Sequence, residues 1–196
     1  MPGLADQPLG RLLDFVAASD PAPGGGSSAA VAAGLGAALL EMAACLEAAR
    51  GDSEIDDALA DRARALRGEA LELADRDMSS YAPVIDARRL PAGDPARAQR
   101  LTAALAEASH TPLAIAENAA ETASLGARVT AVCNPAVRGD ALTGVLIAEA
   151  AAAAAAGLVE INLAGGGGPD LARARDARRR AQEARDDALA TLPRRS

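Results

Sequence analysis

Tryptophan and lysine are absent from this chain of 196 residues, and phenylalanine, tyrosine and histidine occur once each. Proteins that bind nucleic acid present a basic stripe, and those that hold single strands add aromatic side chains on which bases stack. This chain offers neither, because its net charge is −7 and its arginine-rich run at 173–185 is interleaved with acidic residues at helical spacing. We therefore expect no nucleic-acid partner.

Cysteine is also scarce. Cys45 and Cys133 lie far apart, and neither belongs to a Cys-x-x-Cys motif or to a cluster with histidine. This argues against a disulfide framework and against a metal site. The cysteine pattern makes a reducing cytoplasm the expected location. The first residues lack the basic and then apolar segments of a secretory signal, so no such signal is evident.

Alanine supplies much of the apolar half of the sequence. It has the best helix propensity and buries little area, so it favours closely packed helices. No stretch alternates apolar and polar residues for long enough to indicate a half-buried strand. The predicted fold class is all-α.

Proline and glycine clusters divide the chain into six helical stretches, at about 4–19, 28–50, 54–82, 96–125, 136–163 and 170–191. We expect Ser27 to cap the second stretch, Pro112 to kink or interrupt the fourth and Gly126 to end it. Short loops between about six helices predict a single domain, 1–196, folded as an up-and-down bundle.

Two windows, 29–46 and 141–159, are long and apolar enough to raise the question of a membrane. Both consist mostly of alanine and glycine, and each carries a carboxylate, Glu41 or Glu149. Alanine gains little from hydrocarbon, which favours buried helices of a soluble bundle and no membrane partner.

Asp77 occupies a position where a core residue is expected. Steps of three and four residues lead from Leu66 through Ala70 and Leu73 to Asp77 and Tyr81, all on one helix face. A carboxylate there must pair with a cation or take a raised pKa, and a raised pKa suits a general acid or base. The alternatives are an arginine partner from another helix, or a stripe that ends at Leu73.

A glycine-rich turn, Pro23 to Ser27, precedes the second stretch. Glycines before a helix expose N–H groups and a positive dipole end, which can hold a carboxylate or phosphate. The turn matches neither the dinucleotide fingerprint nor the P-loop. A helix start that needs tight backbone packing would explain the run of glycines equally well.

Polar residues flank the apolar fifth stretch. Asn134 and Asn162 fit helix caps, while Asp140 and Glu160 lie between them. The single histidine, His110, falls off the apolar stripe of its helix and is expected to face solvent.

Four segments together resemble one family, that of formiminotetrahydrofolate cyclodeaminase and methenyltetrahydrofolate cyclohydrolase, known from the cyclodeaminase domain of formiminotransferase-cyclodeaminase. The segments are Pro21-Ala22-Pro23-Gly24-Gly25-Gly26-Ser27 continuing to Met42, Asp75-Arg76-Asp77 followed by Tyr81, Pro112-Leu113 with Glu117, and Asn134 to Asp140 followed by Ile161-Asn162-Leu163. The resemblance covers nearly the whole chain, and the glycine string is its most specific part.

The resemblance implies an all-helical domain that forms a homodimer, with the folate site near the subunit interface. It also implies a tetrahydrofolate substrate, with or without a polyglutamate tail, and no further cofactor or metal. Asp77 is the best match to the family's catalytic aspartate, and Asp75 is the next. The positions that match substrate contacts are Gly24, Gly25, Gly26, Ser27, Tyr81, Asn134, Asp140 and Asn162.

The implied reaction converts 5-formiminotetrahydrofolate to 5,10-methenyltetrahydrofolate and ammonia by acid/base catalysis. Hydrolysis of 5,10-methenyltetrahydrofolate is the alternative, since it passes through a similar tetrahedral carbon. A helical dimer that binds folate without catalysis is a further alternative.

Overall fold

The structure, a computed structural model, describes residues 3–19, 23–50, 55–164 and 167–193. Pro21-Ala22 of the glycine motif, the expected start of the third stretch at residue 54 and part of the glycine break after residue 164 lie outside these residues. The described elements are all helical: η1 Leu4–Asp6, α1 Leu9–Ala17, α2 Gly25–Ala48, α3 Asp57–Ser80, α4 Ala82–Arg89, α5 Arg97–Ala108, α6 His110–Val132, α7 Pro135–Asn162 and α8 Pro169–Ala190. The all-α prediction is confirmed.

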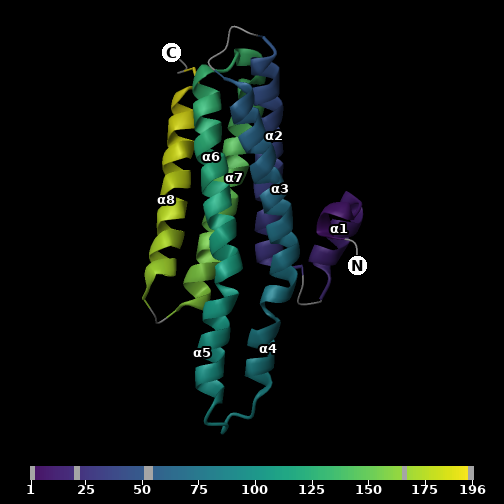
Figure 1. Cartoon of the computed structure of the whole chain (residues 1–196), viewed down its shortest axis with the longest axis vertical. Helices are drawn as coiled ribbons and strands as arrows, with labels where there is room; N and C mark the ends of the chain where they lie inside the picture. The colour runs from purple at the N-terminus through teal and green to yellow at the C-terminus, as the bar shows by residue number, and fades with distance from the viewer. Residues whose placement is uncertain (1–2, 20–22, 51–54, 165–166, 194–196) are drawn as a thin grey trace.

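The long helices of the described residues, α2, α3, α6, α7 and α8, form the bundle (Figure 1). Helix α2 packs against α3 and α7, while α6 packs against α7 and α8, and successive long helices alternate in direction. Helices α4 and α5 continue α3 and α6 beyond the bundle as a hairpin, and α1 stands to one side. The expected up-and-down bundle is therefore present, with an additional helical hairpin at one end.

Each of the six predicted stretches is helical, although three of them divide or extend. The first consists of η1 and α1, the third is followed by α4, and the fourth breaks at Ser109. That break precedes Pro112, which lies in the first turn of α6, where a missing N–H costs no helical hydrogen bond.

Two predicted helix boundaries were wrong. Helix α6 continues through Gly126 to Val132, because Gly126 is a packing residue: a Cβ there would come 2.5 Å from Cγ2 of Val145. The N-cap of α2 is Gly24 and not Ser27, so the helix begins three residues earlier than expected.

The core consists mainly of alanine, which allows the helices to approach closely. A close backbone approach joins α2 to α7, where a Cβ on Gly36 would lie 2.8 Å from the carbonyl oxygen of Gly144. Larger side chains such as Leu40, Leu66 and Ile115 fill the remaining space and are fully buried. Small residues on facing helices thus determine the thickness of the bundle.

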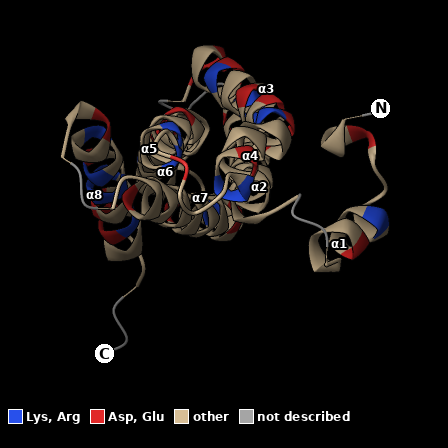
Figure 2. Ribbon diagram, turned by 90° about the horizontal axis from the view of Figure 1, so that it is seen from below, with Lys and Arg blue, Asp and Glu red and all other residues tan. Residues whose placement is uncertain are grey.

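Length and apolar composition alone would allow α2 and α7 to cross a membrane. In the bundle they are central helices, and their carboxylates pair with neighbouring helices. Glu41 accepts hydrogen bonds from Arg64 and Arg67 of α3, and Glu149 accepts one from Arg185 of α8. Figure 2 shows charged residues concentrated on α3 and α8 rather than on α2. The absence of a membrane partner stays a prediction.

Candidate functional site

The carboxylate of Asp77 lies against the first turn of α2. The Ser27 hydroxyl, which is buried, donates a hydrogen bond to Asp77 Oδ2 at 3.0 Å. A Cβ on Gly26 would collide with the carboxylate of Asp77, so only glycine permits this approach. The first turn of a helix carries N–H groups without intrahelical partners and a partial positive charge, which favours an anion at this point.

A pocket of about 300 Å³ opens beside this carboxylate. It lies where the amino end of α2, the α3–α4 junction, the start of α6 and the carboxyl end of α7 meet. Its lining residues are Gly24, Gly25, Gly26, Asp77, Met78, Ser80, Tyr81, Ala82, Ile85, Ala108, Pro112, Leu158 and Asn162. The wall is mostly apolar, and Asp77 supplies its only carboxylate among the described residues. A small apolar pocket with a few converging polar groups is typical of a ligand site.

The pocket brings together six residues that were predicted from the sequence: Gly24, Gly25, Gly26, Asp77, Tyr81 and Asn162. Ser27 lies behind the carboxylate of Asp77 and not in the pocket wall. Tyr81 ends α3, and the guanidinium of Arg88 lies 5.8 Å from the centre of its ring. An arginine partner for Asp77 was one of the alternatives, but among the described residues no arginine pairs with it. The carboxylate of Asp77 accepts its hydrogen bond from Ser27.

Asp75, the second candidate for the catalytic aspartate, lies outside this pocket. It is exposed, and its Oδ1 accepts a hydrogen bond from the backbone N–H of Leu4 at 2.6 Å. Two residues along a helix correspond to a rotation of about 200°, so Asp75 and Asp77 face different neighbours. The contact of Asp75 anchors the amino-terminal segment to α3.

Comparison with known proteins shows the family of this chain. Residues 8–183 match the family model described as formiminotransferase-cyclodeaminase. The chain belongs to this family. It is 34% identical over 125 residues to the formimidoyltransferase-cyclodeaminase of Rattus norvegicus, a match that covers 62% of this chain and 23% of the rat protein. The chain therefore corresponds to about a quarter of that relative's length.

The fold is also that of a solved family structure. The crystal structure of formiminotetrahydrofolate cyclodeaminase from Thermotoga maritima superposes with a TM-score of 0.84 at 21% identity, over 96% of this chain and 97% of that one. The similarity extends over the whole bundle, which agrees with the expected all-helical family domain.

Two predicted contact residues lie far from the pocket in a single chain. Asn134 caps α7, since its side chain accepts a hydrogen bond from the N–H of Ala136 at 2.8 Å, and Asp140 is exposed two turns later. The 28 residues of α7 span roughly 40 Å at 1.5 Å per residue, which separates this end from Asn162. The cap is confirmed, whereas a ligand role for Asn134 or Asp140 stays a prediction.

Sequence reasoning missed the apolar wall of the pocket. Met78, Ile85 and Leu158 line it, yet each resembles an ordinary core residue in sequence. The position of Met78 next to Asp77 in the sequence could have indicated that it lines the pocket. Leu158 is close to the site only because α7 ends there.

His110, as predicted, faces solvent, near Glu107 and Asp170.

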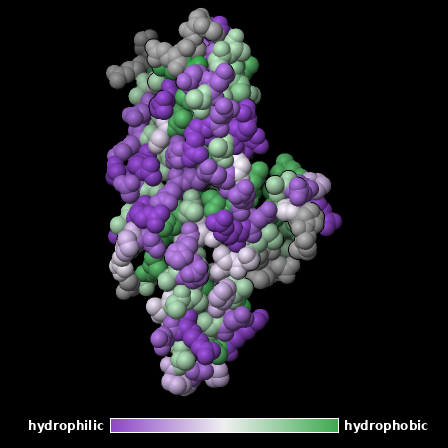
Figure 3. All heavy atoms as spheres, viewed as in Figure 1, coloured by the Kyte–Doolittle hydropathy of each residue, from purple (hydrophilic) through white to green (hydrophobic). Residues whose placement is uncertain are grey.

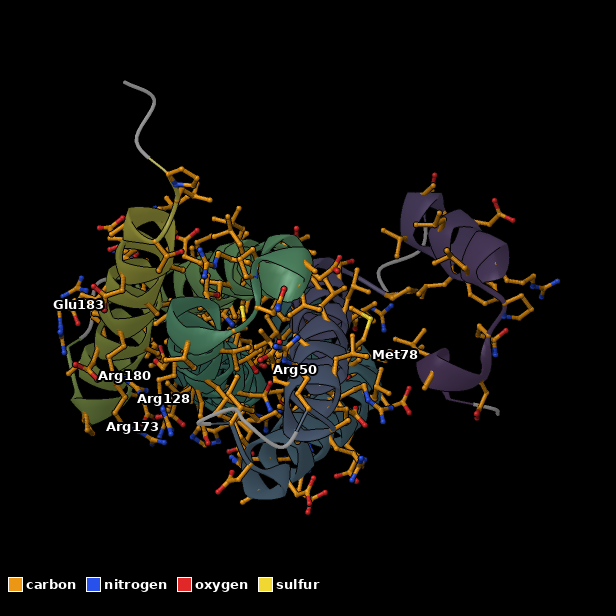
Figure 4. All side chains as sticks on the ribbon, turned by 90° about the horizontal axis from the view of Figure 1, so that it is seen from above. Arg50, Met78, Arg128, Arg173, Arg180 and Glu183 are labelled. Carbon is orange, nitrogen blue, oxygen red and sulfur yellow. The ribbon has the colours of Figure 1, made fainter. Side chains whose placement is uncertain are left out.

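Other hollows of the surface lie along α6, where it faces α3 or α8. One of about 400 Å³ is lined by Glu117, Glu121 and Arg180 among others, and Figure 4 shows Arg173 and Arg180 on this side. Arg173 donates two hydrogen bonds to Glu117, and Arg62 donates two to Glu121, which lowers the pKa of Glu121. The charges of these arginine and glutamate side chains are therefore paired with one another. In the described residues, no group of three or more histidine, cysteine or acidic side chains is placed to hold a metal ion.

Proposed function

We propose that this chain catalyses the cyclodeaminase reaction on 5-formiminotetrahydrofolate, forming 5,10-methenyltetrahydrofolate and ammonia. The observation that carries the proposal is the carboxylate of Asp77, held by Ser27 at the edge of a largely apolar pocket in a member of this family. Both similar proteins are named for this activity.

The reaction requires one proton to move between two nitrogens. N10 of the folate attacks the amidinium carbon on N5, and the C–N10 bond forms. The resulting tetrahedral carbon bears a protonated N10 and a neutral amino group. Asp77 accepts the proton from N10 and returns it to the amino nitrogen, after which the C–N bond to ammonia breaks. A positioned general acid/base of this kind contributes about 10²–10⁴-fold to a rate.

The pocket walls support the positioning of the reacting atoms. Ile85 and Leu158 offer apolar surface to a ring, and the amide of Asn162 offers both a donor and an acceptor. A volume of about 300 Å³ lies at the low end for ligand pockets. It has room for the reacting ring system, while the remainder of the substrate would extend outside it. Bringing N10 to the carbon supplies much of the remaining rate enhancement.

We also propose that the chain works as a homodimer in the cytoplasm, with no cofactor beyond tetrahydrofolate. Helices α2 and α7 bury one side against α3 and α6 and leave apolar residues on the other, an arrangement that favours a second copy. A two-fold dimer in which the α7 helices of the two copies run antiparallel would bring the Asn134 and Asp140 end of each α7 toward the pocket of the other chain. The matching of Asn134 and Asp140 to substrate contacts supports this pairing.

The test is a spectrophotometric assay of the purified protein with 5-formiminotetrahydrofolate and, separately, with 5,10-methenyltetrahydrofolate. Formation of the methenyl compound with ammonia is expected, and its loss by hydrolysis would instead establish the cyclohydrolase. Asp77→Asn should lower kcat by a hundredfold or more, whereas Asp75→Asn, the matched control, should retain most of it. Equal losses in the two variants, or no turnover of either compound, would refute the assignment.

A further inference from the structure

Helix α1 is amphipathic, but in the described part of the chain it buries none of its nine residues. Leu9, Leu12, Leu13 and Val16 form one face of it, which we call the α1 apolar face. Only Leu12 packs against the core of the bundle. Leu9 is 69% exposed and Leu13 is 59% exposed, and Figure 3 shows apolar side chains on the surface of this segment.

The segments on both sides of α1 contact the bundle. On the amino side, Leu4 is buried and its N–H donates to Asp75. On the carboxyl side, Pro23 is buried directly before α2. Figures 1 and 4 show α1 standing away from the bundle between these points. The helix is thus held in place while most of its apolar face meets solvent.

A second apolar surface lies on α2 and α7, on the side opposite α3 and α6. We call it the α2–α7 face, and its large exposed residues are Leu35, Met42, Leu46, Leu146 and Ile161. Leu35 is 55% exposed and Ile161 is 71% exposed. Helices that are apolar on all sides are normally covered on all sides, and here one side is uncovered.

We propose that α1 is an arm whose apolar face packs on the α2–α7 face of a second copy of this chain. The inference deepens the homodimer of the proposed function and rests on it. The exposed large side chains of the two faces present on the order of 700 Å², close to the ~800 Å² per partner of a standard interface. Their apolar character matches that of homodimer interfaces, and a two-fold dimer uses the same surfaces of both chains.

The charges on α1 favour a second copy over a lipid surface. Helices that lie on membranes carry lysine and arginine on their polar face. The polar side of α1 has Arg11 opposed by Asp14, and the chain as a whole has a net charge of −7. An anionic bilayer would therefore repel the protein.

The test compares the full chain with Leu9→Glu/Leu13→Glu and with Gly10→Glu as the matched control. Gly10 lies beside Asp14 on the polar side of α1, and a Cβ there meets no described atom within 4 Å. Sedimentation equilibrium should show a wild-type dimer, a dimer Kd raised at least about a hundredfold in the double variant, and an unchanged Kd in the control. Circular dichroism should show the same bundle in all three proteins, since the exposed leucines contribute nothing to the core.

Three results would overturn the arm. They are a wild-type monomer, equal Kd values in the double variant and the control, or flotation of the wild type with phosphatidylcholine–phosphatidylglycerol vesicles. Leu35→Glu and the turnover assay separate the two proposals. If Leu35→Glu breaks the dimer and the double variant does not, the homodimer stands and the arm is refuted. If the dimer depends on α1 but no folate turns over, the arm stands and the chemistry is refuted.

Discussion

The contact between Gly36 and Gly144 provides a quantitative test of how closely α2 and α7 pack. In Gly144→Ala the new Cβ would lie 2.9 Å from the carbonyl oxygen of Gly36 and 3.2 Å from two side-chain carbons of Leu40. The leucine can rotate, but a helix carbonyl cannot move alone. The substitution must therefore push one helix away from the other.

Two opposing effects determine the expected magnitude. Alanine is better than glycine in a helix by about 1 kcal/mol, which stabilises the variant. Overpacking of a tight contact costs about 1–3 kcal/mol, and more where backbone atoms have to move. We expect Gly144→Ala to lose about 1–2 kcal/mol of unfolding free energy. Gly68 is exposed on α3, and a Cβ added there would meet no described atom within 4 Å. Only the gain in helix propensity remains at this position, so Gly68→Ala should stabilise the protein by about 0.5–1 kcal/mol.

Urea denaturation followed by circular dichroism measures both changes in the same host. Protein concentration must be held constant, because the proposed dimer would contribute to apparent stability. The decisive quantity is the difference between the two variants, about 1.5–3 kcal/mol in favour of Gly68→Ala. Equal stabilisation by both alanines would show that α2 and α7 are farther apart than this packing requires, and would refute the reasoning.

Two further predictions concern the site and the response to acid. Gly26→Ala should lower kcat about a hundredfold or more with little change in melting temperature. The reason is that the new Cβ displaces the side chain of Asp77 without moving the backbone. An unchanged kcat would contradict the close approach of Gly26 to Asp77. The hydrogen bond from Arg67, followed by that from Arg64, keeps the pKa of Glu41 below its usual 4.5. Its contribution to stability is thus present above pH 4.5 and is lost as the pH falls through the lower, folded-state pKa. Thermal melts should show a shallower acid decline for Glu41→Gln than for the wild type, and parallel curves would count against the ion pair.

Much of the local structure could be predicted from the sequence. Alanine content and helical spacing predicted the class, and the Leu66–Leu73 stripe placed Asp77 on the inner face of α3. The helix boundaries at Ser27 and Gly126 were wrong because the sequence does not show what a glycine packs against. Gly126 resembles a helix end, yet in the bundle it leaves room for Val145.

The sequence by itself therefore determined the helices, the family and the identity of the main candidate residue, since these depend on local propensity, on periodicity and on a continuous motif. Only the tertiary structure decided which predicted residues meet. It placed Asn162 and Asp77 in the wall of one pocket and put Asp140 near the other end of α7, because the two ends of α7 are separated by the length of the bundle. It also showed that Asp75 anchors the amino-terminal segment, and that the α1 apolar face, Leu12 apart, is exposed among the described residues. Neither property can be predicted from sequence spacing, because both depend on where other helices lie in space.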